Sequence, residues 1–245
     1  SQRPFRAPHH TISDVALIGG GQWPRPGEVS LAHHGVLFLD EALEFRRNVL
    51  EALREPLEVG KITVARASTT ITYPASFILV LACNPCPCGY LGDTKKTCTC
   101  SYQQIARYRA KLSGPLLDRI DLQVEIPRLD FSEIASEKKE ETSQEVRERV
   151  QKAREIQAER FREERIRLNG QMSARYLRRF SPVQGEAKKL LEASMESLAL
   201  SARAYHRILK VARTIADLEQ SETIQLEHVA EAIHYRSLDR KYQEP

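Results

Sequence analysis

Two acidic residues, Asp40 and Glu41, directly follow the apolar run VLFL at positions 36–39. A short continuous apolar run is typical of a strand that is buried on both faces of a parallel sheet. Ligands of parallel sheets bind at the carboxyl ends of the strands, so we expect both carboxylates at a binding crevice. In nucleotide hydrolases the first acid of such a pair holds the Mg²⁺ shell and the second polarises the attacking water. The alternative is that the two acids only stabilise the start of the next helix.

Two more polar residues are of types that phosphate chemistry uses. Asn84 ends the apolar run in LVLACNP, where its amide would lie beside a phosphate and the attacking water. The alternative is a turn residue before Pro85, because asparagine favours turns. Arg119, in SGPLLDRIDL, forms either a surface ion pair with Asp118 or Asp121, or reaches into a neighbouring subunit's site and stabilises transition-state charge.

The five cysteines lie close together in the chain. Cys86-x-Cys88 and Cys98-x-Cys100 form two pairs, joined by a nine-residue polar connector. Four thiolates from two pairs suit tetrahedral Zn²⁺, and a metal would hold a connector that cannot fold by burial. Four free thiols, or disulfides formed on oxidation, are the alternative. Cys83 belongs to the preceding apolar run, and we expect it to be a buried small hydrophobe rather than a ligand.

The elements that position these residues follow from the hydrophobic pattern. FILVLACN predicts a second buried strand, the alternating DLQVEI at 121–126 predicts a third, and KITVARASTTITYP predicts a hairpin. EFRRNVLEALREPLE predicts a helix that stops at Pro56. The apolar face of this helix consists of Phe45, Val49, Leu50 and Leu53.

The composition changes in the second half of the chain. Acids and bases alternate densely from Glu133 to Arg167, which indicates a long solvated helix or a helical connector. Three amphipathic helices follow, with apolar faces around Leu191, Ile208 and Val229. We therefore expect an α/β core over residues 1–128, a charged helical connector over 129–168 and a helical lid domain over 169–245.

The totals indicate a soluble globular protein of 245 residues, 41% of them hydrophobic and 29% charged. There are 37 basic against 33 acidic side chains, so the net charge of +4 permits nucleic-acid contact without arguing for it. No apolar run approaches the roughly 20 residues of a membrane span. The N-terminus, SQRPFRAPHH, lacks the apolar core of a signal peptide. We expect a cytoplasmic protein with no membrane partner.

Several longer motifs occur in the order FRAPHHTIS, GGGQWPRPGEVSLAHHGVLFLDE, LREPLE, NPCPCG and SGPLLDRIDL. With them, nearly the whole chain resembles the magnesium-chelatase-like AAA+ proteins of the ComM/YifB family. These are bacterial ring ATPases implicated in branch migration of DNA during natural transformation. The resemblance implies an AAA+ core with a parallel sheet, a helical lid, ATP and Mg²⁺ as cofactors, and a homo-oligomeric, hexameric ring on DNA. It also supports Zn²⁺ at the cysteines.

The resemblance assigns roles to individual residues. The acids at 40–41 correspond to the Walker B pair, the first of them on Mg²⁺, and Asn84 corresponds to sensor 1. Arg119 corresponds to the arginine finger. Arg203, near the start of a predicted helix in LSARAYHRIL, corresponds to sensor 2, although Arg207, one turn later on the same face, is an alternative.

One departure from the family pattern matters for activity. The sequence contains no G-x-x-x-x-G-K-[ST], the P-loop whose backbone and lysine cradle the phosphates. In the family this loop lies upstream of RPFRAPHH. We therefore expect a fragment that begins after the P-loop, lacks the Walker A strand and hydrolyses ATP poorly by itself.

The resemblance also places two insertions in the central pore of the ring, the Gly-rich segment around Leu17 to Glu28 and the predicted hairpin from Lys61 to Tyr73. Trp23 would stack a base there, and three cations would hold phosphates. The alternative for each is an ordinary solvated or packing side chain. The three cations are Arg25, Lys61 and Arg66.

Two histidine doublets stand out, His9-His10 and His33-His34. Adjacent side chains in an extended segment point in opposite directions, so a doublet is a poor chelator. We interpret these histidines as structural or subunit-interface residues.

Two other functions remain open from the sequence. One is an ATPase subunit of magnesium-chelatase type, which drives metal insertion into a porphyrin. The other is a non-catalytic, zinc-stabilised interaction module, which the missing P-loop favours. A GKT or GKS upstream of this sequence in the parent reading frame would restore the ATPase.

Overall fold

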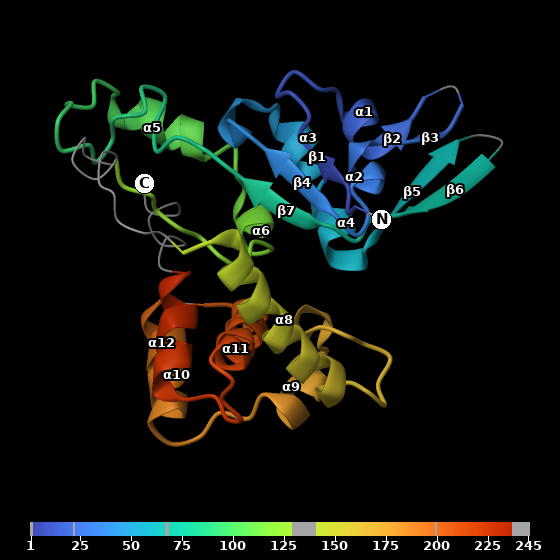
Figure 1. The fold of residues 1–245 in the computed structure, drawn as a ribbon. Helices are drawn as coiled ribbons and strands as arrows, with labels where there is room; N and C mark the ends of the chain where they lie inside the picture. Colours follow the sequence, from blue (N-terminus) through green and yellow to red (C-terminus); the bar gives the residue numbers. More distant parts are fainter. Residues whose placement is uncertain (1, 22, 67–68, 129–140, 199, 237–245) are drawn as a thin grey trace. The chain divides into compact units, whose positions relative to one another are not determined.

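The computed structural model describes residues 2–21, 23–66, 69–128, 141–198 and 200–236 (Figure 1). The chain forms two compact units that divide between Ile120 and Asp121. The first contains the sheet and the hairpins, and the second is helical.

The first unit is built on a three-stranded parallel sheet in the order β1-β4-β7. The central strand β4 holds Leu37 and Leu39, which are fully buried. This confirms the parallel sheet and the two strands that were predicted before Asp40 and Asn84. The strands are β1 (Phe5–Arg6), β4 (Val36–Leu39) and β7 (Ile78–Leu81).

The expectation that these strands are buried on both faces is wrong. Phe5, Ile78 and Val80 are 65%, 56% and 40% exposed, and the strand register places them on the face opposite Leu37. Val36 and Phe38, on the same face, are partly buried, so this face is covered less than the face that carries Leu37. Apolar composition indicates how much surface a strand can bury, but burial itself depends on a covering element.

The helix predicted after Glu41 is broken into short pieces. Its four expected apolar residues are fully buried, so the face was predicted correctly. Pro56 does not stop the helix but lies in the first turn of a new one, where a missing N–H costs nothing. The pieces are η1 (Ala42–Glu44), α3 (Arg47–Glu51) and α4 (Arg54–Val59).

Two antiparallel hairpins extend from this unit (Figure 1). The second confirms the prediction from KITVARASTTITYP, although its turn, 67–68, lies outside the described residues. At the base of the first, a Cβ on Gly27 would lie 2.4 Å from the Leu17 carbonyl oxygen, so only glycine fits. The elements are α1 (Asp14–Ile18), β2 (Gly19–Gly20), β3 (Arg25–Pro26), α2 (Glu28–Leu31), β5 (Lys61–Arg66) and β6 (Thr69–Pro74).

The cysteine-rich loop leads into α5 (Tyr102–Arg109) and α6 (Gly114–Leu117). Ser101 and Gln104 form a capping box that starts α5, and Ser113 caps α6. The sequence pattern did not predict these two helices because they carry few apolar residues, but their caps were readable from S-x-x-Q and S-G-P.

The second unit packs its helices around one apolar core that includes Leu191, Ile208, Ala212 and Val229. All three predicted amphipathic helices are present, and α9 is an additional one. The charged segment contains α8, while residues 129–140 of that prediction lie outside the described residues. The helices are α8 (Ser143–Arg160), α9 (Ala174–Phe180), α10 (Gly185–Ser197), α11 (Ala202–Leu218) and α12 (Leu226–His234).

A buried polar network joins the end of α8 to α11. Asp217 is fully buried and accepts hydrogen bonds from Arg160, Asn169 and Arg213, at 2.7 Å from Asn169 and 3.1 Å from Arg213. Gln157, also buried, accepts from the Asn169 backbone N–H at 3.1 Å. Although α8 is rich in charged residues, these buried hydrogen bonds therefore fix its C-terminal end within the helical unit.

The prediction of a strand at 121–126 is wrong. These residues form no strand in the structure. Leu122, Val124 and Ile126 are exposed. The Gln123 N–H donates to the Tyr235 carbonyl at 2.9 Å, a backbone bond that is not part of a strand ladder. Alternating residues form a strand only beside a hydrogen-bonding neighbour. Among the described helices, none is both long and apolar enough to cross a membrane.

Candidate functional site

The acid pair lies at the carboxyl end of the central strand. Asp40 and Glu41 immediately follow β4, and both are exposed. Backbone bonds join this edge to β7, from Ala82 N–H to the Leu39 carbonyl at 3.0 Å and from Ala42 N–H to the Ala82 carbonyl at 2.8 Å. The Asp40 carboxylate accepts the Glu41 backbone N–H at 2.9 Å. Two carboxylates therefore meet solvent at the edge where parallel sheets bind ligands.

The conformation of Glu41 is unusual for its residue type. Its backbone φ of 50° lies in the left-handed region, which residues other than glycine and asparagine rarely adopt. Its carboxylate lies 3.3 Å from Nδ1 of His10, whose ring meets the buried ring of Phe45 edge-on. Strain of this kind persists where the surrounding structure enforces it, and it is frequent at functional sites. The contact gives one member of the first histidine doublet a place at the acid pair.

Asn84 lies at the same edge of the sheet. It is exposed, three residues past the end of β7, which runs parallel to β4 in the register Leu39 to Leu81. The structure thus brings Asn84 and the acid pair to neighbouring strand ends, as the sequence predicted.

Arg119 is largely buried within the first unit rather than directed into solvent. Its side chain is only 9% exposed, forms an ion pair with Glu58 and donates to the Pro115 carbonyl at 2.6 Å. Its Nε is buried and has no hydrogen-bond partner among the residues that the structure describes. A role at a neighbour's site requires this side chain to leave Glu58.

The two sensor candidates lie on α11 in the second unit. Arg203 is exposed in the first turn of this helix, which Ser201 caps. Arg207 is less exposed and forms an ion pair with Asp121. The two arginines therefore differ in environment, and Arg203 is the more accessible to a ligand.

Four cysteines form a compact cluster. The Sγ atoms of Cys86, Cys88, Cys98 and Cys100 all lie within 4.8 Å of one another. Three of the separations are 3.4, 3.7 and 3.6 Å. Sulfurs on tetrahedral Zn²⁺ lie roughly 3.8 Å apart, because each Zn–S bond is about 2.3 Å. The donor set and its spacing therefore fit Zn²⁺.

The thiols of the cluster differ in acidity. Backbone N–H groups of Tyr90 and Thr99 lower the pKa of Cys88 to about 6, because they stabilise the thiolate that a metal needs. Desolvation raises the pKa of Cys100 to about 12. Cys83 lies outside the cluster, as expected, but it is exposed, so its predicted burial is wrong.

The candidate DNA contacts lie on the two hairpins. Trp23 is 77% exposed, and Arg25 and Lys61 are also exposed. The side chain of Arg66 lies outside the described residues. An exposed indole with nearby cations is the combination that stacks bases and holds phosphates.

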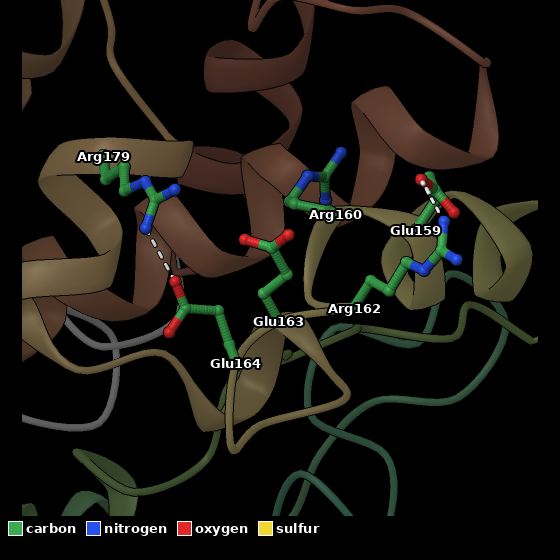
Figure 2. Close-up of a pocket in the computed structure, with 6 residues that line it drawn as sticks. All are labelled: Glu159, Arg160, Arg162, Glu163, Glu164 and Arg179. Atoms are coloured by element: carbon green, nitrogen blue, oxygen red, sulfur yellow. Dashed lines mark hydrogen bonds and ion pairs between the residues drawn. The ribbon is translucent and has the colours of Figure 1, made fainter.

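A separate polar hollow occurs in the second unit (Figure 2). Two of its arginines are already paired, Arg179 with Glu164 at 2.6 Å and Arg162 with Glu159 at 3.8 Å. Three acids and three arginines line it, so their formal charges cancel and leave no net positive charge for a phosphate. We assign it no site. Its lining consists of Glu159, Arg160, Arg162, Glu163, Glu164 and Arg179.

The sequence did not predict three residues that contact the candidate site residues. Glu58 pairs with Arg119, Asp121 pairs with Arg207, and His10 meets Glu41. His10 stands out in the sequence only as half of a doublet. For Glu58 and Asp121 there is no sequence signal, because each pairing depends on how separate segments pack.

Comparison with known proteins places this geometry in a family. Residues 1–134 match the family model described as magnesium chelatase, subunit ChlI, and residues 140–236 match that of the ChlI C-terminal region. Over 99% of its own length, this chain is 50% identical to competence protein ComM of Haemophilus influenzae. Over 98% of its own length, it is 48% identical to YifB of Escherichia coli. These alignments cover 47% and 46% of the two relatives, so the chain spans about half the length of the curated relatives it matches. The chain belongs to the magnesium chelatase ChlI family.

Proposed function

We propose that this chain forms part of an ATP-driven ring motor that acts on DNA, with active sites shared between neighbouring subunits. The observation that supports it best is the pair Asp40–Glu41 at the carboxyl end of the central strand, beside the strand end that carries Asn84. The similarity to a protein named for competence supports DNA as the substrate class.

In this proposal each polar group has one task. Asp40 holds Mg²⁺, which neutralises charge on the phosphates when bound. Glu41 polarises the attacking water, and Asn84 orients that water beside the transferred phosphate. This chain contains no P-loop. In this proposal, another part of the full-length protein therefore supplies the phosphate cradle.

Two arginines complete the site. Arg119 leaves Glu58 when the ring assembles and stabilises transition-state charge in the neighbour's site. Arg203 acts as sensor 2 from the lid domain. In this proposal the chain also divides into a core at 1–128, a connector at 129–168 and a lid at 169–245. The ring is hexameric and cytoplasmic.

A glutamate-to-glutamine substitution tests this function in the full-length protein. Glu41→Gln is expected to reduce DNA-stimulated ATP hydrolysis to background while nucleotide binding remains, because the water loses its polarising charge and Asp40 still supports Mg²⁺. Glu44→Gln is the matched control, since Glu44 lies one turn away near Lys111 and has no proposed role. Wild-type turnover by Glu41→Gln would remove Glu41 from the mechanism.

Two other functions have specific support. The family description names magnesium chelatase, which favours an ATPase that drives metal insertion into a porphyrin. The zinc-compatible cysteine cluster favours a non-catalytic interaction module. Porphyrin-dependent rather than DNA-dependent hydrolysis identifies the first, and no hydrolysis by the full-length protein identifies the second.

A further inference from the structure

The β5–β6 hairpin has two faces of different character. Ile62 and Val64 are buried, and the register of the hairpin places Tyr73 opposite Ile62 on the same face. Thr63 and Thr72 occupy the other face, are exposed and lie with their hydroxyl oxygens 3.1 Å apart. One face is therefore available for packing within the unit, and the other meets solvent.

Tyr73 connects this hairpin to the first one. Its hydroxyl donates to the Pro24 carbonyl at 2.9 Å, across 49 positions of sequence. Pro24 stands between Trp23 and Arg25, the two candidate DNA contacts of the first hairpin. The hydrogen bond thus holds the backbone that carries the exposed indole.

The turn of the first hairpin is closed by a short ladder in which Gly19 pairs with Pro26 and Gly20 pairs with Arg25. Gly19, Gly20 and Gly21 have φ values of 111°, 131° and 95°, and none has a side chain that packs. Such a glycine run is inexpensive to deform, since glycine adopts many backbone conformations. The Tyr73 hydroxyl therefore adds a side-chain contact to this backbone ladder, at the residue that directly follows Trp23.

We propose that Tyr73 is a positioning residue that fastens the Trp23–Arg25 turn onto the β5–β6 hairpin, so that both hairpins form one surface for single-stranded nucleic acid. Trp23 stacks a base on this surface, while Arg25 and Lys61 hold the backbone phosphates. Residues 61–74 contain no acidic side chain that would repel them. The inference rests on the proposed DNA function.

The chain provides its own probe, because Trp23 is its single tryptophan. We expect Tyr73→Phe to lower the fluorescence anisotropy of Trp23 in the free chain, since the turn becomes more mobile. Binding of a fluorescein-labelled oligodeoxythymidine should weaken roughly tenfold in Trp23→Ala, the order expected for the loss of one base stack. Tyr73→Phe should weaken oligonucleotide binding about threefold, because the base stack on Trp23 is then less well positioned.

A double variant separates positioning from direct contact. If Tyr73 acts by positioning the Trp23–Arg25 turn, Tyr73→Phe causes a smaller loss in the Trp23→Ala background than in the wild-type chain. Tyr176→Phe is the matched control, because it removes a 2.8 Å hydroxyl bond to Glu164 in the second unit. It should change neither the anisotropy nor the affinity.

The outcomes distinguish this inference from the function on which it rests. If Trp23→Ala weakens binding but Tyr73→Phe changes neither readout, Tyr73 is not a positioning residue and the DNA function stands. Additive losses in the double variant also overturn the inference. If the wild-type chain and Trp23→Ala bind the oligonucleotide equally, the DNA contact at this hairpin is itself wrong.

Discussion

The cysteine cluster shows at the residue scale how spacing translates into a site. The two C-x-C pairs of the sequence place four sulfur atoms within 4.8 Å of one another in the structure. The polar connector between them offers little apolar surface, so a metal would contribute directly to its folding.

Metal analysis tests the cluster. The purified, reduced chain should carry about one equivalent of Zn²⁺, as expected for a four-thiolate structural site. Cys86→Ser should lower the metal content, because it removes a buried ligand, whereas Cys83→Ser should leave it unchanged. A metal-free wild-type chain, prepared without chelator, would exclude the site.

His33 provides a pH-dependent signal in the first unit. Its Nδ1 accepts the Ser76 backbone N–H at 3.0 Å, and burial together with the neighbouring His34 lowers its pKa below the usual value of 6.5. The native state therefore disfavours the protonated ring, so the contribution of His33 to stability is full above pH 6.5 and is lost as the pH falls from 6.5 through the lowered pKa of His33. The NMR midpoint of His33 should lie below 6.5 and should rise in His34→Asn. A midpoint above 6.5 would contradict this assignment.

At the element scale, the sequence predicted what local pattern controls. The strands before Asp40 and Asn84, the β5–β6 hairpin and the helices of the second unit follow from apolar periodicity. The strand at 121–126 and the burial of both sheet faces failed, because each depends on a neighbour that no local pattern specifies. The ion pair between Arg119 and Glu58 could not be predicted from the sequence for the same reason.

The Asp217 network allows a stability prediction at this scale. Asp217→Asn leaves Arg160 and Arg213 without their carboxylate, and removal of one partner of a buried pair costs about 3–5 kcal/mol. We expect the free energy of unfolding to fall by this order in urea. The control Glu192→Gln removes only an exposed pair with Lys188, so its change should stay below about 1 kcal/mol. Equal effects of the two substitutions would show that the network does not stabilise the fold.

At the scale of the whole molecule, the α/β unit and the helical unit agree with the AAA+ fold expected for the magnesium chelatase ChlI family. The chain supplies acids at one strand end and an arginine that is held within its own unit. In the proposed shared active site, the buried Nε of Arg119, which has no hydrogen-bond partner among the described residues, would gain a neighbour's phosphate as its partner.

A subunit-mixing measurement tests the shared site most directly. In the full-length protein, Glu41→Gln and Arg119→Ala should each abolish ATP hydrolysis when pure, since an arginine finger contributes roughly 10³ to 10⁵ in rate. Mixed rings contain junctions where an intact Glu41 site meets an intact Arg119 from its neighbour. We predict that the mixture hydrolyses ATP faster than the sum of the two separate variants. If native mass spectrometry shows mixed rings and hydrolysis stays at that sum, Arg119 does not act in the neighbouring subunit's site and the shared-site account is wrong.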